Sequence, residues 1–176
     1  MNALVERPDV PVPYRVVDRY EETHDVVTLH VRPLDGALPR FRPAQFSMIG
    51  VPGVGEVPIS ISSACDDRTA HGYTLRRAGA VTNALWERGT GDVVTVRGPF
   101  GRPWNLDRID GRHVVFVAGG IGIAPLRAAV VEVAARSGGA SGSISVLVGA
   151  ATPGDHLFRP WYDALVAGGH TFGKMH

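Results

Sequence analysis

The first hundred residues alternate between hydrophobic and polar side chains in short segments that turn residues separate. In residues 26–32, three aliphatic side chains face one way and three polar side chains face the other, which is typical of a half-buried antiparallel strand. A short helix is expected at residues 81–88. Strands are expected at residues 14–20, 26–32, 45–51, 57–62, 73–77 and 93–97. Six short strands with this spacing predict a small antiparallel β-barrel.

The pattern changes after a glycine- and proline-rich break at residues 98–103. Residues 113–118 are an uninterrupted apolar run, as expected of a strand that is buried on both faces, and residues 144–148 are a second such run. An alanine-rich helix is expected at residues 125–136 and another helix at residues 158–166. This alternation of strand and helix predicts a parallel α/β lobe.

The predicted fold class is therefore β + α/β, an N-terminal antiparallel β-barrel followed by a partial parallel α/β lobe. The barrel is assigned to residues 10–105 and the lobe to residues 111–168. The lobe is called partial because two strands are expected in it, whereas nucleotide-binding lobes of this kind usually have four or more. Residues 169–176 show no periodicity and are expected to form an irregular tail.

Composition argues against several classes of function. The 18 Lys and Arg residues nearly balance the 17 Asp and Glu residues, so charge gives no case for nucleic-acid binding. The single cysteine, Cys65, cannot form an internal disulfide or hold an iron–sulfur cluster alone, and the histidines lack metal-ligand spacing, so no metal site is expected. Charged residues and glycines interrupt the most apolar stretch, so no membrane span is expected. With no secretion signal, a cytoplasmic location is expected.

A glycine-rich motif follows the first apolar run and carries the clearest chemical signal. Glycines in such a turn let the backbone approach a pyrophosphate, and the N-terminus of the following helix offers free N–H groups to an anion. A purely structural strand-to-helix turn remains an alternative, because such turns often need glycine. Position 140, where the standard dinucleotide fingerprint places an acidic residue, is Ala140. The candidate dinucleotide-binding residues are Gly119, Gly120, Gly122, Ala124 and Pro125.

The Gly-Gly-x-Gly-x-x-Pro pattern resembles that of the ferredoxin–NADP reductase superfamily. Members of that superfamily hold FAD on an upstream Arg-x-Tyr-Ser/Thr strand, and residues 57–60 stand at the matching place. The resemblance implies that Ser60 is the catalytic residue that orients the flavin N5, with Pro58 and Ile59 beside the cofactor. Val57 replaces the arginine and Ile59 replaces the aromatic residue, so a phosphate contact and a ring-stacking contact are lost.

A second segment also resembles the flavin motifs of this superfamily. Gly79, Val81 and Thr82 match the start of the helix that receives the FAD pyrophosphate, and the free N–H groups of a helix N-terminus suit that role. Arg76 and Arg77 precede it. Either one supplies the charge that Val57 does not, or both belong to a solvated strand end.

Residues 55–63 look most like the FAD/NAD(P)H-binding, gamma-type subunits of nickel–iron hydrogenase, sulfhydrogenase and anaerobic sulfite reductase. The resemblance implies an FAD-dependent oxidoreductase that moves a hydride between NAD(P)H and FAD and passes electrons to a redox partner protein or to other enzyme subunits. Members of the family continue with further strands and a four-cysteine [2Fe–2S] site. The resemblance therefore implies a C-terminally truncated chain without an iron–sulfur cluster, or a chain whose missing part another chain supplies. The alternatives are a non-catalytic flavin-binding or partner-docking fragment and a plain β-barrel scaffold.

Overall fold

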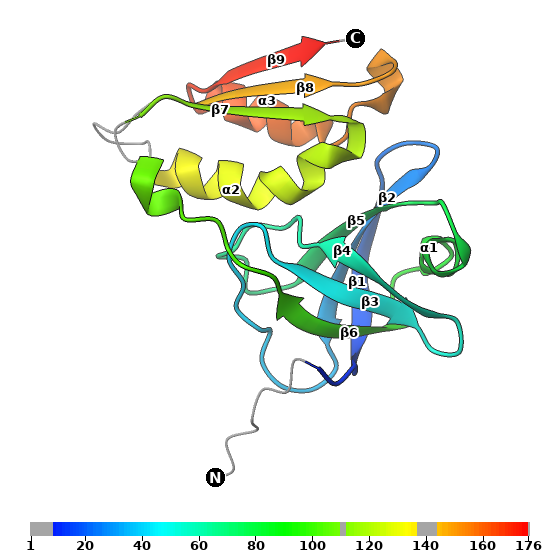
Figure 1. Ribbon diagram of the computed structural model, residues 1–176. Coiled ribbons are helices and arrows are strands. Elements are labelled where there is room, and N and C mark those ends of the chain that lie inside the picture. The colour runs from blue at the N-terminus through cyan, green and yellow to red at the C-terminus, as the bar shows by residue number, and fades with distance from the viewer. Residues whose placement is uncertain (1–8, 110–111, 137–143, 176) are drawn as a thin grey trace.

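The computed structural model of the chain describes residues 9–109, 112–136 and 144–175. A β-barrel forms one half of the molecule, and a smaller α/β lobe packs against one end of it (Figure 1). The described part of the N-terminus lies on the barrel and the C-terminus lies on the far side of the α/β lobe. The predicted β + α/β fold class is confirmed.

The barrel is a six-stranded antiparallel sheet with the strand order β4-β3-β6-β1-β2-β5. A bridge between Ile61 and Tyr73 links the two outer strands and nearly closes the sheet. A short helix, α1 (Ala80–Trp86), connects the last two strands. The strands are β1 (Val12–Glu21), β2 (Val26–Pro33), β3 (Phe46–Val51), β4 (Gly55–Ser60), β5 (His71–Arg76) and β6 (Val93–Phe100). All six correspond to strands that the alternating pattern predicts.

The α/β lobe contains a parallel sheet of three strands in the order β7-β8-β9. Its two helices lie on the same face of this sheet (Figure 1). Short 3₁₀ helices, η1 (Leu106–Ile109), η2 (Gly120–Gly122) and η3 (Pro153–Asp155), stand in the connections. The other elements are β7 (Val114–Gly119), α2 (Ile123–Arg136), β8 (Ile144–Gly149), α3 (Arg159–Ala167) and β9 (Thr171–Met175).

The expectation of an irregular tail at residues 169–176 is wrong. Strand β9 occupies most of this segment and pairs in parallel with β8, from Thr171 opposite Ser145 onward. The ring of Phe172 stacks on Tyr162 of α3 at a centroid distance of 3.9 Å. The strand is stabilised by its backbone pairing with β8 and by this tertiary contact. Neither interaction requires hydrophobic and polar residues to alternate, so the five-residue sequence carries no strand signal.

The cores of the two lobes interlock at their boundary. Val26, at the start of β2, packs in the apolar core of the α/β lobe. Ala128 of α2 packs in the core of the barrel. The lobes therefore bury apolar surface against each other. No helix within the described residues is long and apolar enough to cross a membrane.

The buried imidazole of His71 makes the stability of the barrel depend on pH. Its Nε2 lies 3.0 Å from the carbonyl oxygen of Pro39 and donates to it, and its ring packs between those of Phe41 and Tyr73. Burial lowers the pKa of His71 from 6.5 to about 4. Between pH 6.5 and about 4, the unfolded chain therefore binds a proton at His71 that the folded chain does not bind. The resulting stabilisation is complete above pH 6.5 and is lost as the pH falls from 6.5 to about 4.

We expect this loss to be about 3 kcal/mol in the free energy of unfolding. Urea unfolding at a series of pH values measures it. The control is His71→Gln, which can donate to Pro39 but does not titrate, so its stability should fall less steeply over the same interval. Equal pH slopes for the two proteins would contradict this account of His71.

Candidate functional site

Strand β4 forms an edge of the barrel sheet, and this edge carries the first group of candidate residues. The strand pairs with β3 through residues such as Ser60, which lies opposite Phe46. Pro58 is exposed on the strand, and an edge position suits proline because it has no backbone N–H to donate. Beyond Ser60 the chain turns toward β5, where the Ser62 amide donates to the Gly72 carbonyl at 2.8 Å. Among the described strands, none is hydrogen-bonded to the outer side of β4 before that point.

Ser60 ends this edge with a half-exposed side chain. Its hydroxyl makes no hydrogen bond with any residue that the structure describes. The neighbouring Ile59 is also half-buried, and Val57 packs against the barrel core. A free hydroxyl beside an aliphatic side chain offers one hydrogen bond and one apolar contact to a planar ligand.

The turn into α1 carries the second group. The Thr82 hydroxyl accepts hydrogen bonds from the backbone N–H groups of Ala78 and Gly79, at 3.0 and 2.9 Å. The threonine side chain therefore closes its own turn. Contact with a ligand is left to the first N–H groups of the helix, which have no partner within it. A Cβ atom added to Gly79 would meet no other atom within 4 Å, so the space above the turn is open.

The two arginines before this turn have partners within the protein. The Nε of Arg76 lies 3.0 Å from a carboxylate oxygen of Asp25. The guanidinium of Arg77 lies over the ring of Trp86, 5.7 Å from its centroid. Both side chains are exposed. The structure thus ties Arg76 to the β1–β2 hairpin and Arg77 to α1.

The glycine turn of the α/β lobe carries the third group. Gly120 has a φ of +50°, in the left-handed region that favours glycine. Cβ atoms added to Gly119, Gly120 or Gly122 would meet nothing within 4 Å. The protein itself therefore does not require small residues at Gly119 and Gly122, and the space over this turn is free for a ligand.

The next two candidates differ in their access to that space. Ala124 is 3% exposed and its side chain belongs to the core of the lobe. Pro125 is half-buried in the first turn of α2, where proline costs no hydrogen bond. The side chain of Ala124 therefore packs in the core of the α/β lobe.

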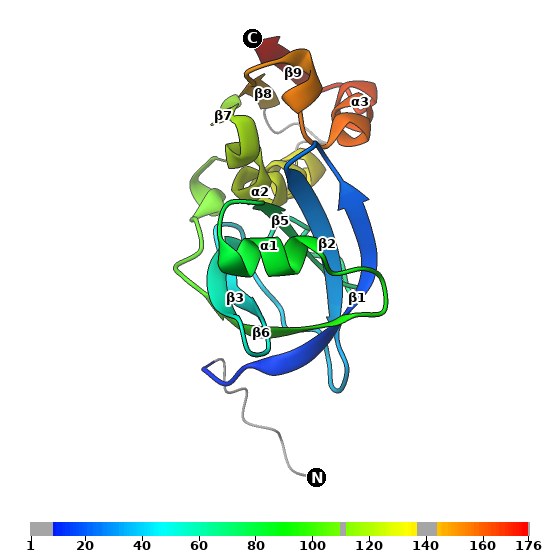
Figure 2. The ribbon, with the colours of Figure 1, turned by 90° about the vertical axis from the view of Figure 1, so that its right-hand side faces the viewer.

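The three groups surround the junction of the lobes. Helix α1 packs on β3 and β4, and a Cβ added to Gly55 of β4 would lie 3.3 Å from Val81. The glycine turn η2 contacts β5, the strand that leads into the turn before α1. Figure 2 shows α1 on the side of the barrel and the α/β lobe at its end. Strand β5 therefore links the two glycine-containing helix starts.

Arg127 of α2 crosses the junction and is a residue that the sequence analysis missed. Its Nη1 donates to the Ser62 carbonyl at 3.2 Å, and its guanidinium lies 4.8 Å from the ring centroid of Phe158 and 5.5 Å from that of Trp161. Burial lowers the pKa of Arg127, while Glu22 on the β1–β2 hairpin opposes the shift. The hydrogen bond to Ser62 therefore holds α2 against the barrel two residues after Ser60.

A chain of hydroxyl groups continues from this point through the barrel. Ser62 Oγ lies 2.9 Å from Thr74 Oγ1, which lies 2.9 Å from Thr28 Oγ1. The Thr28 hydroxyl donates to Glu22 at 2.8 Å. The other carboxylate oxygen of Glu22 accepts from the Phe158 amide at 2.9 Å. This network joins the strand after Ser60 to the α/β lobe.

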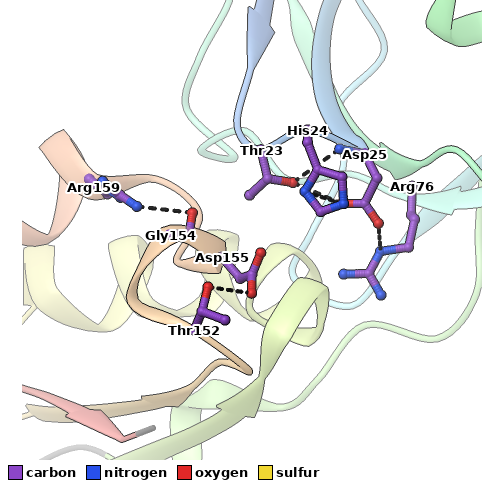
Figure 3. Close-up of polar contacts among 8 residues, drawn as sticks. All are labelled: Thr23, His24, Asp25, Arg76, Thr152, Gly154, Asp155 and Arg159. Atoms are coloured by element: carbon purple, nitrogen blue, oxygen red, sulfur yellow. Dashed lines mark hydrogen bonds and ion pairs between the residues drawn. The ribbon is translucent and has the colours of Figure 1, made fainter.

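The tip of the β1–β2 hairpin meets the turn before α3 at the same boundary (Figure 3). In that turn, the Thr152 hydroxyl donates to Asp155 at 2.7 Å, and Arg159 donates to the Gly154 carbonyl at 2.9 Å. On the hairpin, Asp25 accepts from Thr23 and pairs with Arg76. Each of the two segments is therefore stabilised by contacts of its own. No group of His, Cys, Asp and Glu side chains among the described residues could hold a metal ion.

Comparison with known proteins identifies homologues in sequence. The chain is 42% identical over 87 residues to sulfhydrogenase 1 subunit gamma of Pyrococcus furiosus, a match that covers 49% of this chain and 30% of that protein. It is 40% identical over 116 residues to a probable dihydroorotate dehydrogenase B (NAD(+)) electron transfer subunit of Methanopyrus kandleri, covering 66% of this chain and 42% of that protein. The chain thus spans less than half the length of these two relatives. No family model matches it.

Solved structures share the fold at low sequence identity. The FAD/NAD-binding domain of a nitric oxide dioxygenase from Vibrio cholerae superposes with a TM-score of 0.80 at 21% identity, over 93% of this chain and 73% of that one. The ferredoxin–NADP⁺ reductase of Plasmodium falciparum superposes with a TM-score of 0.79 at 15% identity, over 97% of this chain and 72% of that one.

Proposed function

Because this chain is a homologue of hydrogenase gamma subunits and dihydroorotate dehydrogenase electron-transfer subunits, and has the ferredoxin–NADP reductase-like fold, we propose that it is an FAD-dependent electron-transfer oxidoreductase. Its substrate is NAD(P)H, and its partners are a redox protein or the other subunits of a larger enzyme. The observation that carries the proposal is the pair of glycine-containing helix starts adjoining β5, both open to a ligand.

The residues present fit FAD. The free Ser60 hydroxyl is suited to a hydrogen bond with the flavin N5, and Ile59 to packing against the ring system. Backbone N–H groups at Val81 and Thr82, with the open turn at Gly79, suit the pyrophosphate. Val57 gives no charge to the phosphates, so their neutralisation rests on these amides and on an Arg76 or Arg77 released from its present partner.

Hydride transfer needs no acid or base from the protein, because FAD supplies that chemistry when it is bound. The chain must hold the nicotinamide and flavin rings together and exclude water. Gly119, Gly120, Gly122 and Pro125 hold the dinucleotide, with Ala124 contributing through its backbone. Arg127 and the hydroxyl network from Ser62 to Glu22 fix the distance between this turn and the flavin strand.

Anaerobic addition of NADH or NADPH to the flavin-loaded protein tests the proposal. We expect the visible flavin absorbance to bleach, and to return when a one-electron acceptor is added. Flavin that neither nucleotide bleaches would contradict the oxidoreductase proposal and favour a non-catalytic flavin-binding protein. Protein that takes up no flavin would contradict both and favour a β-barrel scaffold.

Replacing Ser60 with alanine should leave flavin binding nearly unchanged but alter its reactivity. The hydroxyl has no structural partner among the described residues, so its removal does not disturb the fold. We expect a shift in the flavin reduction potential, or a fall of roughly tenfold in the rate of reduction by NAD(P)H, as for the loss of one hydrogen bond. Potentiometry and stopped-flow absorbance measure the two quantities.

The matched variant is Ser60→Thr, which keeps the hydroxyl and should restore most of the rate. If Ser60→Ala has the wild-type potential and the wild-type rate, Ser60 does not contact N5.

A further inference from the structure

We propose that a second site, a pocket on the side of the barrel, binds a small organic anion that carries a phosphate group. The pocket has a volume of about 560 Å³, within the range of small-molecule sites. It is lined by Arg32, Pro33, Leu34, Gly36, Ala37, Leu38, Arg40 and Arg68. No residue of the proposed FAD or nucleotide site lines it. The proposal does not depend on the proposed function.

Three arginines reach this pocket from three segments. Arg32 stands near the end of β2, Arg40 in the loop before β3, and Arg68 in the loop before β5. Their guanidinium groups make no hydrogen bond, ion pair or ring contact with any residue that the structure describes. Arg76, Arg97 and Arg127 all have such contacts. The pocket therefore concentrates positive charge that no described residue pairs with directly.

The carboxylates closest in sequence, Asp35, Asp66 and Asp67, do not line the pocket. Asp35 is exposed on the same loop but does not line the pocket. Asp67, next to Arg68, accepts hydrogen bonds from both the amide and the hydroxyl of Thr69. The lining thus combines three cations with the apolar side chains of Pro33, Leu34 and Leu38.

The loop that forms most of the wall is anchored before any ligand arrives. The Leu34 amide donates to the Pro13 carbonyl at 3.1 Å. The Pro39 carbonyl accepts from the buried His71, and Leu38 packs against the barrel core. Gly36, with a φ of +85°, makes the turn between these anchors. A preformed wall lowers the ordering cost of binding.

The pocket does not include the glycine turn. Its β2 residues are Arg32 and Pro33, and Pro33 pairs with Tyr14 near the start of β1. At a strand rise of about 3.4 Å per residue, Arg32 lies roughly 20 Å from Val26, the β2 residue that packs in the core of the α/β lobe. No residue of the glycine turn lines the pocket, so a ligand there occupies a different site from one held at the turn.

The three guanidinium groups of the pocket indicate which chemical class of ligand it can bind. Their planar fork matches phosphate and carboxylate oxygens, and several of them together favour an anion with more than one charge. The apolar wall suits the carbon skeleton of a small molecule. The chain is near-neutral, so its overall charge does not favour nucleic acid as the ligand.

Calorimetric titration of the whole chain with inorganic pyrophosphate, at low salt, tests the proposal. We expect a saturable component of one site per chain that depends on the pocket arginines, separate from any binding at the two glycine-containing helix starts. Arg40→Gln and Arg68→Gln should each weaken it about tenfold or more, as for the loss of a charge-assisted hydrogen bond. Both side chains are exposed and unpartnered among the described residues, so neither change should alter the circular dichroism or the unfolding midpoint.

The matched control is Arg112→Gln, an exposed arginine outside the pocket, which should bind pyrophosphate like the wild type. Equal weakening in all three variants would show a general charge effect and overturn the proposal. Citrate binding without pyrophosphate binding would overturn the phosphate assignment. Binding of polyglutamate alone would mean that the arginines meet an acidic protein, which also overturns it. Flavin content and NADH bleaching are measured separately, so failure here leaves the proposed function unaffected.

Discussion

Replacing Thr82 with aspartate is expected to weaken flavin binding severely. The new carboxylate would stand at the start of α1, beside the backbone amides that we assign to the FAD pyrophosphate. Like charges a few ångströms apart near a protein surface repel by several kcal/mol, so we expect affinity to fall by at least about a hundredfold. Fluorescence titration of the flavin-free protein with FAD measures the affinity.

The matched control is Thr82→Asn, which has almost the same shape as aspartate but no charge. Either side chain can accept the hydrogen bonds that Thr82 now accepts from Ala78 and Gly79, so the turn should persist in both variants. The asparagine variant should therefore keep most of the flavin affinity. Similar affinities for the aspartate and asparagine variants would show that the pyrophosphate lies elsewhere.

Replacing Arg127 with methionine is expected to weaken the junction of the two lobes. The change removes the hydrogen bond to Ser62, leaves the carbonyl without its donor, and removes the cation from the rings of Phe158 and Trp161. We expect the free energy of unfolding to fall by about 2 kcal/mol. Urea unfolding followed by tryptophan fluorescence measures it.

Two further variants show whether this loss is specific to the junction. Arg127→Lys keeps the charge but not the planar guanidinium, so an intermediate loss is expected. Arg112→Met removes an exposed arginine and should change stability little. The Arg127→Met variant could instead be as stable as the Arg112 variant, or more stable than the wild type. That result would mean that the free-energy cost of burying Arg127 outweighs the stabilisation from its contacts.

Most of the barrel could be predicted because hydrophobic and polar residues alternate along strands such as β2. Val27, Leu29 and Val31 are fully buried on β2 and alternate with polar residues, which is the signal that a period of two detects. The end of the chain gave no such signal. The pairing of β9 with β8 and the stacking of Phe172 on Tyr162 are tertiary contacts, so no local pattern announces them.

Likewise, some residues of the candidate site could be proposed from the sequence and others could not. The sequence could propose Ser60, Thr82 and Gly120 as site residues because a motif depends on residues that are close together in the chain. Arg127 was missed because its partners, Ser62 and Phe158, lie far from it in the chain. A single arginine on an alanine-rich helix looks like a solvated side chain until the fold brings those partners to it. The arginine pocket was missed for the same reason, since its three cations come from separate segments.

Identifying the cofactor released from the purified chain tests whether the barrel binds FAD. The purified chain is loaded with a mixture of FAD and FMN, freed of excess flavin and denatured, and the supernatant is separated by chromatography. The pyrophosphate assignment at Gly79–Thr82 predicts about one FAD per chain and little FMN, because FMN has no pyrophosphate to fill that turn. Recovery of FMN alone, or of no flavin, would contradict the account.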